Sequence, residues 1–312
     1  MKRVSEEDFL RAWKRYRSAS EVAKLFEMPE RSVHSRRRRI EQRTGEILET
    51  NDPRSTSYRI KQKSPRVECS LPDGVIMVAS DAHYWPGVIS PAHRAFVSLI
   101  KELKPRIVVA NGDMFDGAGI SRHPPNRYDA LPSVKEELKA VDDRMTEIEK
   151  AAKGADLWWC YGNHDQRFEA TLAARVPEFR DVEGFTLKHH FPRWKFTMSL
   201  FVNQSLMIKH RYKGGVHATW NNTLYGGVSM CTGHLHRLQA TIMGDYRGTR
   251  WGIDSGTLAD IDGEHMYYGE DDPKNHCSGF AVLTFHKGRL LHPEFCAVHD
   301  GVPFFRGKEV KC

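Results

Sequence analysis

The chain has 312 residues, of which 40% are hydrophobic and 28% are charged, and its net charge is +7. These proportions are typical of a globular protein with a buried core, and they exclude a disordered or fibrous chain. No apolar run approaches the roughly 18–20 residues that cross a bilayer, so we expect no membrane partner. The first residues, MKRVSEEDFL, lack the apolar core of a secretory signal, and we therefore expect a cytoplasmic protein.

The cysteines support the same compartment. They are scattered along the chain and form no Cys-x-x-Cys pair. This spacing is typical of reduced thiols and argues against a disulfide framework or a cysteine-rich zinc site. The six are Cys69, Cys160, Cys231, Cys277, Cys296 and Cys312.

The positive charge is concentrated near the N-terminus. Residues 1–67 contain 18 Lys and Arg against 10 Asp and Glu, whereas the remaining residues contain 29 against 30. All of the basic excess therefore lies in the first fifth of the chain. This asymmetry predicts a basic module for a polyanion, attached to a nearly neutral body.

The first 50 residues have the pattern of three short helices. Residues 5–17 have apolar side chains at helical spacing, and Ser18 to Glu21 form a capping box that predicts a second helix over 21–26. A turn at Glu27 precedes a third helix over 29–44. This third helix carries a basic block made of Arg36, Arg37, Arg38 and Arg39.

A helix, a tight turn and a basic helix resemble a helix-turn-helix module. Ala23 and Val33 stand at its small and apolar core positions, while Glu27 replaces the glycine that is common in the turn. We therefore predict a DNA-binding module over residues 1–50 that contacts nucleic acid through the four arginines at 36–39. The alternative is a helical hairpin with a solvated charged face. The polar, basic residues 51–66 are predicted to be a linker.

The body, residues 67–312, begins as an alternation of strands and helices. Apolar runs at 75–80, 106–110 and 156–161 have the length of buried strands. Residues 91–103 and 134–153 between them have helical periodicity. This order predicts an α/β layered core.

The pattern changes in the second half of the chain, where short apolar runs are separated by turns. We expect these runs to form a second sheet packed on the first. The predicted strands are 196–202, 205–209, 228–232, 238–243, 249–253, 280–285 and 290–295.

Five clusters of Asp, Asn and His follow apolar runs. Carboxylate, amide and imidazole groups are ligands for divalent metals, and a rigid sheet can gather them from distant parts of a sequence. The clusters are Asp81-x-His83, Gly112-Asp113-x-x-Asp116, Gly162-Asn163-His164-Asp165, His210 and Gly233-His234-x-His236.

These motifs, in this order over about residues 70–260, resemble the calcineurin-like metallophosphoesterase superfamily. The resemblance implies a four-layer α/β/β/α sandwich and two divalent metals about 3.5–4 Å apart, which activate water and neutralise phosphoryl oxygens. It assigns Asp81, His83, Asp113 and His236 to one metal, and Asp113, Asn163, His210 and His234 to the other. Manganese is the expected metal, with iron, zinc and magnesium as alternatives.

The same resemblance gives His164 a catalytic role, in which it protonates the leaving oxygen or stabilises the transition state. Asp165 is predicted to orient His164, and Asp116 is predicted to support the ligands rather than to bind metal. His217 competes with His210, but His210 directly ends the apolar run at 206–209.

Three functions remain open at this point. The basic module favours a DNA nuclease, and the motifs look closest to the repair-exonuclease branch, in a form similar to phage and prophage proteins that act in a host cytoplasm. Arg122 and Arg211 are predicted to contact phosphates around the metals. The alternatives are a phosphatase or small-molecule phosphodiesterase, and a catalytically silent DNA-binding protein.

Overall fold

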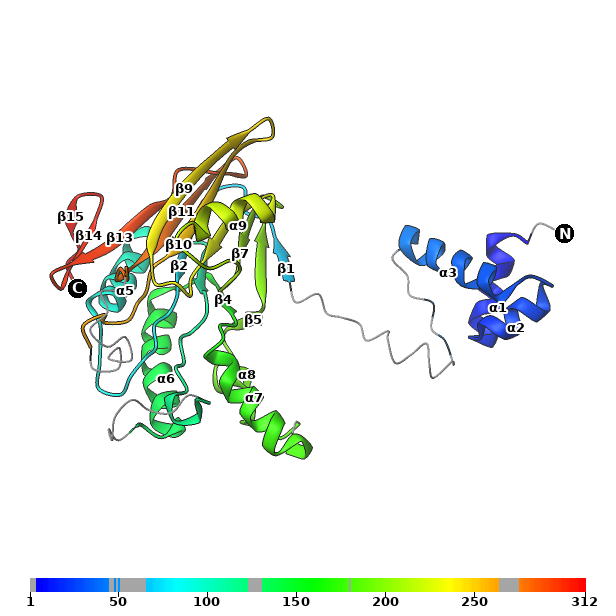
Figure 1. Ribbon diagram of the computed structural model, residues 1–312, viewed down its shortest axis with the longest axis horizontal. Helices are drawn as coiled ribbons and strands as arrows, with labels where there is room; N and C mark the ends of the chain where they lie inside the picture. The colour runs from blue at the N-terminus through cyan, green and yellow to red at the C-terminus, as the bar shows by residue number, and fades with distance from the viewer. Residues whose placement is uncertain are drawn as a thin grey trace. The chain divides into compact units, whose positions relative to one another are not determined.

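The computed structural model describes residues 4–44, 48, 50, 66–122, 131–179, 181–263 and 275–312. The chain divides into two compact units, Met1–Ser64 and Pro65–Cys312 (Figure 1). Residues 51–65, which make up nearly all of the predicted linker, lie outside the described residues.

The N-terminal unit contains the helices α1 (Glu6–Tyr16), α2 (Ala19–Leu25) and α3 (Glu30–Thr44). They pack around a small core that includes Phe9, Trp13, Val22, Val33 and Ile40. Helix α2 begins two residues earlier than expected, because the Ser18 hydroxyl caps it by accepting a bond from the Glu21 amide.

The turn between α2 and α3 contains Glu27 at a φ of 46°. This is the left-handed conformation that glycine adopts at least cost. Glu27 therefore takes the backbone conformation of the glycine that it replaces.

In the described part of the body the strands form two sheets. The nine-stranded sheet has the order β15-β14-β13-β11-β2-β3-β4-β5, with β12 paired to β11. Strands β2, β3, β4 and β5 are parallel to one another, and the others pair antiparallel. The strands are β2 (Gly74–Ala79), β3 (Ile107–Ala110), β4 (Asp156–Cys160), β5 (Lys195–Thr197), β11 (Gly279–His286), β12 (Arg289–Leu290), β13 (Glu294–His299), β14 (Val302–Phe305) and β15 (Lys308–Glu309).

The six-stranded sheet has the order β1-β6-β7-β8-β10-β9. In it β7 and β8 run parallel, as do β8 and β10. The strands are β1 (Arg66–Cys69), β6 (Ser199–Val202), β7 (Leu206–Ile208), β8 (Ser229–Thr232), β9 (Leu238–Asp245) and β10 (Gly248–Ser255).

Helices cover the outer faces of both sheets. On the nine-stranded sheet, α5 (Pro91–Leu103) and α6 (Val134–Ala151) share one hydrophobic core with β2, β3, β4 and β11. On the six-stranded sheet, α9 (Ala218–Gly226) packs against β8, β9 and β10. The remaining helices are α7 (Asp165–Arg175), α8 (Leu187–His190), η1 (Ala118–Ile120) and η2 (Pro177–Phe179).

Strand β2 explains why the sheets stack. Its Met77 and Ala79 face the α5 and α6 core, whereas Ile76 and Val78 face the core between the two sheets. Because side chains alternate along a strand, a continuous apolar run buries both faces. The predicted α/β/β/α sandwich is confirmed.

The second half of the body differs from the prediction in its strand pairing. Strands β5 and β11–β15 join the first sheet rather than a second one, because β11 pairs antiparallel with β2 and β5 pairs with β4. The run at 196–202 is two strands, β5 and β6, which lie in different sheets. The run at 290–295 is likewise divided between β12 and β13. Helices α7 and α9 were not predicted.

Candidate metal centre

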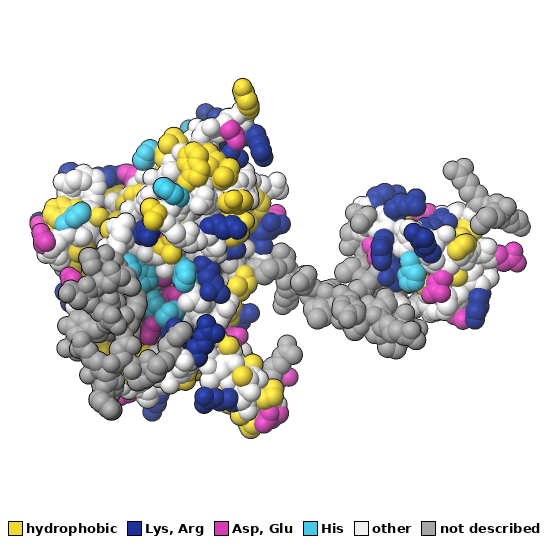
Figure 2. Space-filling model, in the orientation of Figure 1, with side chains coloured by type: hydrophobic (Ala, Val, Ile, Leu, Met, Phe, Trp, Pro, Cys, Tyr) yellow, Lys and Arg dark blue, Asp and Glu magenta, His cyan; other side chains and the backbone are white. Residues whose placement is uncertain are grey.

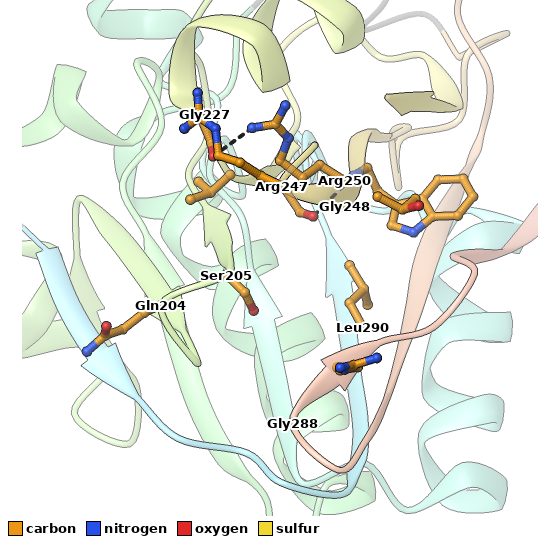
Figure 3. A pocket seen from close by; sticks show the side chains of 13 residues that line it. Gln204, Ser205, Gly227, Arg247, Gly248, Arg250, Gly288 and Leu290 are labelled. Carbon is orange, nitrogen blue, oxygen red and sulfur yellow. Dashed lines mark hydrogen bonds between the residues drawn. The ribbon is translucent and has the colours of Figure 1, made fainter. Parts of the chain in front are cut away.

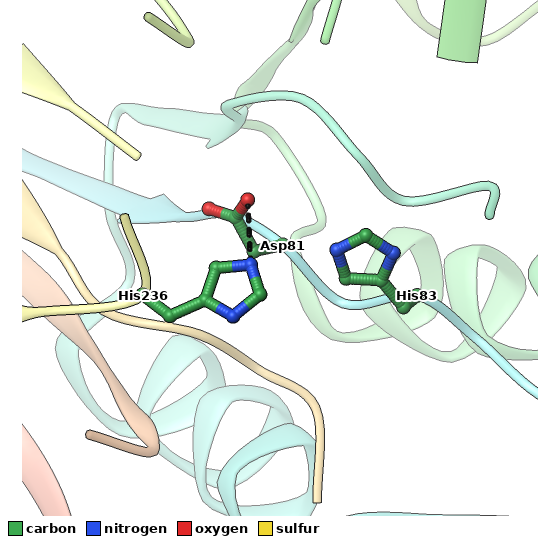
Figure 4. Close-up of side chains that lie close together, drawn as sticks. All are labelled: Asp81, His83 and His236. Atoms are coloured by element: carbon green, nitrogen blue, oxygen red, sulfur yellow. Dashed lines mark ion pairs between the residues drawn. The ribbon is translucent and has the colours of Figure 1, made fainter. Parts of the chain in front are cut away.

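The five motifs meet where strands β2, β3, β4, β7 and β8 end, since each motif directly follows one of them. Within the described residues, three groups of three side chains each place one ligand atom per residue within 4.8 Å of the others; one of them, His83, Asp116 and His164, shares His83 with the first of the two groups described next. The first group is Asp81, His83 and His236 (Figure 4), and the second is Asp113, His210 and His234. Each of these two groups falls within one of the two ligand sets implied by the resemblance.

Asp81 is the fixed point of the first group. Its Oδ2 accepts a hydrogen bond of 2.8 Å from the backbone N–H of His234. Its Oδ1 lies 3.2 Å from His236 Nε2 and 3.9 Å from His210 Nε2. Asp81 is fully buried. Its Oδ1 therefore faces imidazoles from both groups without competition from solvent.

His210 and Asp113 form the centre of the second group. The Nδ1–H of His210 donates to the carbonyl of Asn111 at 2.8 Å, which leaves Nε2 facing Asp113 Oδ2 at 3.0 Å. Asp113 Oδ1 accepts from the backbone N–H of His164 at 2.8 Å. A backbone partner on Nδ1 fixes the tautomer of a histidine ligand and directs its Nε2 lone pair inward.

The buried carboxylates beside His210 favour a positive charge at this position. Burial lowers the pKa of His210, but the carboxylates of Asp113 and Asp81 outweigh it and raise that pKa to about 10. Burial likewise raises the pKa of Asp113, and His210 outweighs it and lowers that pKa to about 2. A bound divalent cation would supply the same positive charge.

The donor set also fits a metal by its unsatisfied atoms. Buried polar atoms normally have a hydrogen-bond partner, and an unpartnered one is costly. Five predicted ligands each hold a buried side-chain atom that has no hydrogen-bond partner among the described residues. These atoms are Asp81 Oδ1, His83 Nε2, Asn163 Oδ1, His210 Nε2 and His236 Nδ1. Carboxylate, amide and imidazole groups of this kind are ligands that divalent ions prefer.

The backbone of the site is held in an uncommon conformation. Five predicted ligands have φ between 42° and 72°, in the left-handed region that non-glycine residues rarely enter. Such backbone conformations persist only where the surrounding structure enforces them. The residues are Asp81, His83, Asp113, His234 and His236.

The glycines of the motifs make room for the ligands. A Cβ on Gly162 would lie 2.0 Å from Asp113 Oδ1, and one on Gly233 would lie 2.5 Å from Asp81 Oδ2. A Cβ on Gly112 would lie 2.4 Å from His210 Nδ1, and Gly112 also has a φ of 89°. Close approach of the ligands therefore excludes a side chain at all three positions.

Asp116 orients His164, the histidine that was predicted to be catalytic. Asp116 Oδ1 accepts from the Nδ1–H of His164 at 2.8 Å and from the Nδ1–H of His83 at the same distance. Burial lowers the pKa of His164, but the bond to Asp116 and the charge of Asp113 raise it overall. The prediction that Asp165 orients His164 is wrong, because Asp116 holds that position and Asp165 makes other contacts.

Asp165 instead clamps the loop that follows β3. It is fully buried, and its two oxygens accept hydrogen bonds from five N–H groups. Burial and the nearby Asp113 raise the pKa of Asp165, while these donors stabilise its ionised form. The donors are the backbone N–H groups of Asp113, Met114, Phe115 and Gly162 and the indole of Trp159.

Arg167 is a site residue that sequence reasoning missed. It lies in the first turn of α7, where its Nη1 donates to the carbonyl of Asp116 at 3.0 Å and its Nη2 to His164 Nε2 at 3.1 Å. Its position three residues after His164, on one face of a helix, was the available signal, but α7 itself was not predicted.

The predicted nucleic-acid contacts separate into two kinds. Arg37 is buried, with its guanidinium 4.8 Å from the ring centre of Trp13, and Arg36 donates to the carbonyl of Val4. The burial of Arg37 corrects the prediction that it contacts nucleic acid, whereas Arg36 is half-buried and its DNA contact stays a prediction. Arg38, Arg39, Arg122 and Arg211 are exposed.

A pocket of about 600 Å³ lies away from this centre (Figure 3). It is lined by residues at the starts of β7, β8 and β10 and in the β11–β12 turn, whereas the ligands follow the ends of strands. Arg247, Arg250 and Arg289 contribute to its lining. None of the predicted ligands contributes to this pocket.

Comparisons with known proteins give similar solved structures and one matching family. Vps29 from Entamoeba histolytica, in a zinc complex, is similar to 76% of this chain over 99% of its own, with 12% identity and a TM-score of 0.41. An archaeal phosphodiesterase covers 72% of this chain and 99% of its own (12% identity, TM-score 0.37), and Yfce, a phosphoesterase from E. coli, covers 70% and 97% (16% identity, TM-score 0.34). No curated protein matches. The model of the calcineurin-like phosphoesterase family matches residues 74–242, which is more than half of the chain and includes every predicted ligand, so the chain belongs to that family.

Proposed function

We propose that this protein is a metal-dependent phosphodiesterase that cleaves DNA, with its basic N-terminal unit holding the substrate. The observation that carries the proposal is the grouping of candidate ligands, five of which hold a buried and unpartnered atom, near an oriented His164. Membership of the calcineurin-like phosphoesterase family supports hydrolysis of a phosphate ester, and the candidate ligands support divalent metal ions. DNA as the substrate rests on the basic unit.

The metal ions would be held by residues already grouped by the fold. Asp81, His83 and His236 would hold one, and His210, His234 and Asn163 would hold the other, with Asp113 as a candidate ligand for both. When bound, two such ions activate water and neutralise charge on the phosphoryl oxygens. The chain then has to orient the phosphate and deliver a proton to the leaving oxygen.

We assign the first of these tasks to Arg167 and the second to His164, because the two side chains contact each other. Because a guanidinium only donates, its contact with His164 Nε2 requires that nitrogen to be unprotonated. Phosphate oxygens are stronger hydrogen-bond acceptors for Arg167 than the imidazole nitrogen. When the guanidinium moves to a bound phosphate, His164 Nε2 becomes free to carry a proton. Asp116 keeps the opposite nitrogen, Nδ1, as the donor throughout. We propose that His164 protonates the leaving oxygen and Arg167 binds the phosphoryl group.

The N-terminal unit supports DNA over a small ester. Its exposed Arg38 and Arg39 lie on α3, the helix that a helix-turn-helix module inserts into the major groove. Lys and Arg contacts to phosphates release counterions, so DNA binding by this unit would weaken with salt. None of the described helices is long and apolar enough to cross a membrane.

The first experiment measures hydrolysis by the full-length, manganese-loaded protein. The substrates are single- and double-stranded DNA, an aryl phosphodiester and an aryl phosphomonoester, with Asp113→Asn as the inactive control. We expect DNA cleavage that the control lacks. Hydrolysis of aryl esters with intact DNA would replace the nuclease proposal by a small-molecule phosphodiesterase or phosphatase. DNA binding without any hydrolysis would favour a silent DNA-binding protein.

The role of the basic unit is tested separately. Arg38→Ala/Arg39→Ala should weaken DNA binding and lower the slope of log K against log salt by about 0.9 for each lost phosphate contact. The matched control is Arg11→Ala/Lys14→Ala, which removes two exposed charges from α1 of the same unit. Equal effects of the two pairs would show that net charge, rather than α3, attracts DNA.

A further inference from the structure

One long segment of the body contains no acidic residue. Between Glu183 and Asp245 the chain has seven Lys and Arg and neither Asp nor Glu. The same segment carries three candidate ligands, His210, His234 and His236. Positive charge is therefore concentrated on the part of the body that carries three of the seven candidate ligands.

Cations and aromatic rings lie close together on both sides of His210 in the chain and on the nearby helix α9. Lys209 Nζ lies 5.1 Å from the ring centre of Tyr212, and Lys213 Nζ lies 5.1 Å from the same ring. Lys213 Nζ also lies 4.9 Å from the ring centre of Tyr225. Tyr212 and Tyr225 are 42% and 66% exposed, so the row of cations and rings lies at the surface.

Helix α9 extends this row with an unusual exposed face. Trp220 and Leu224 lie four residues apart on the helix and are 44% and 53% exposed, and Val216, two residues before its start, is 73% exposed. The opposite face of the helix is buried against the sheet through Thr219 and Thr223. Hydrophobic side chains gather over α9 on the same face of the body as the His and Asp cluster of the site (Figure 2).

The surface is tied to the metal centre by side-chain bonds. The backbone N–H of Lys213 donates to Asn222 Oδ1, and Asn222 Nδ2 donates to the hydroxyl of Thr232, just before Gly233 and His234. Arg237 directly follows the candidate ligand His236, and its Nη1 donates to the carbonyl of Gly215. The loop that carries Tyr212 is thus held between two ligand-bearing segments.

The cations of this surface are available to an anion. Within the described residues, Lys209, Arg211 and Lys213 form no ion pair with a carboxylate. Arg211 is exposed and directly follows the candidate ligand His210 in the chain. A strand whose phosphates reach Arg211 would also reach the metal centre.

We propose that the surface formed by Lys209, Arg211, Tyr212, Lys213, Trp220 and Tyr225 binds single-stranded nucleic acid and feeds it to the metal centre. The inference rests on the proposed nuclease function and names the form of its substrate. Rings that stack on bases, interleaved with cations that contact phosphates, are the usual means of binding an unpaired strand. A duplex hides its base faces and would gain only the phosphate contacts.

The location is tested by photo-crosslinking on the full-length protein. The probe is a thymidine oligonucleotide of about 12 residues, within the usual site size, with 5-iodouracil at single positions. Crosslinked peptides are mapped by mass spectrometry. We expect crosslinks at residues 212–225. Crosslinks confined to other parts of the chain, the N-terminal unit included, would overturn the proposal.

The energetics are tested by fluorescence anisotropy with the same thymidine strand and with a duplex. Trp220→Ala and Tyr225→Ala should each raise the Kd for the single strand at least about fivefold and change duplex binding less. Trp220→Tyr should restore most of the affinity, because it keeps a ring. The control is Tyr246→Ala, which removes a fully exposed ring from the β9–β10 turn. Equal single-strand affinity in Trp220→Ala and the wild type would refute the inference.

These tests are independent of catalysis. If the manganese-loaded wild type leaves DNA intact, the nuclease proposal fails, yet the crosslink map and the variant affinities still decide whether the surface binds a strand. If the wild type cleaves DNA and the aromatic variants bind and cleave it equally well, the nuclease stands and this surface is excluded from it.

Discussion

Asp165→Asn tests the role that the structure gives to this carboxylate. Its two oxygens accept five hydrogen bonds: Oδ1 takes two, from Met114 and Phe115, and Oδ2 takes three. Asparagine keeps only one acceptor oxygen. At best, the asparagine oxygen replaces Oδ2 and keeps its three hydrogen bonds. The amide N–H groups then replace Oδ1 and face the N–H groups of Met114 and Phe115, which lose their acceptor.

The expected loss of unfolding free energy in Asp165→Asn follows from these hydrogen bonds. A hydrogen bond to a charged group contributes about 1.5–3 kcal/mol, so the loss of two corresponds to about 3–6 kcal/mol of unfolding free energy. This is a large part of the roughly 5–15 kcal/mol that stabilises a typical domain. The loop from Asp113 to Phe115 should lose its fixed conformation, and metal affinity should fall with it, because Asp113 is a candidate ligand for both ions.

The assay is urea unfolding followed by circular dichroism, together with calorimetric titration of Mn²⁺. The matched variant is Asp116→Asn, whose amide oxygen can still accept from both His83 and His164, since both bonds go to one oxygen. We expect it to keep most of its stability and to lose about 10²–10⁴-fold in turnover, the usual contribution of general acid–base catalysis. A stable Asp165→Asn protein, within about 1 kcal/mol of the wild type but slow in turnover, would refute this division of roles.

Three further predictions follow from single contacts. Gly162→Ala should abolish tight metal binding, as measured by calorimetry, because its Cβ would lie 2.0 Å from Asp113 Oδ1; unchanged binding would contradict the geometry. Mn²⁺ at 100 times its Kd should raise the unfolding free energy by about 2.7 kcal/mol, and Asp81→Ala should remove most of that gain. Burial and Asp116 raise the pKa of Glu137 from 4.5 to about 7, so its folded state holds the proton more tightly and stability falls as pH rises between those values. Glu137→Gln should flatten this part of the curve in urea unfolding from pH 4 to 8, and a slope that stays unchanged would exclude Glu137 as its source.

The site was predictable because its donors share a position in the sequence pattern. Each of the five motifs directly follows a run of apolar residues, and parallel strands bring their carboxyl ends to one edge of a sheet. The neighbouring runs ending at Ala79, Ala110 and Cys160 satisfy that condition through direct pairing of β2, β3 and β4. Local composition was enough to find these residues.

The pairing of later strands could not be read in the same way. Strand β11 pairs with β2 across about 200 residues of chain, with Ala281 opposite Val78. Periodicity shows that Phe280 to Phe285 form a strand, but it contains no information about which sheet edge is free. Helix α9 was missed for a related reason: Trp220 and Leu224 are exposed, so its apolar pattern does not mark its buried face.

The assignment of Asp165 failed because adjacency in sequence was taken for contact in space. Asp165 follows His164 directly, but it begins α7 and points into the core, while Asp116 reaches the imidazole from 48 residues away. The same carboxylate explains the strained backbone of the site. Left-handed residues cost of order 1–3 kcal/mol each, and Asp113 is one of five among the candidate ligands. The N–H groups of Asp113 and the next two residues converge on Asp165, so this buried clamp offsets the strain that directs the Asp113 carboxylate between the two ligand groups.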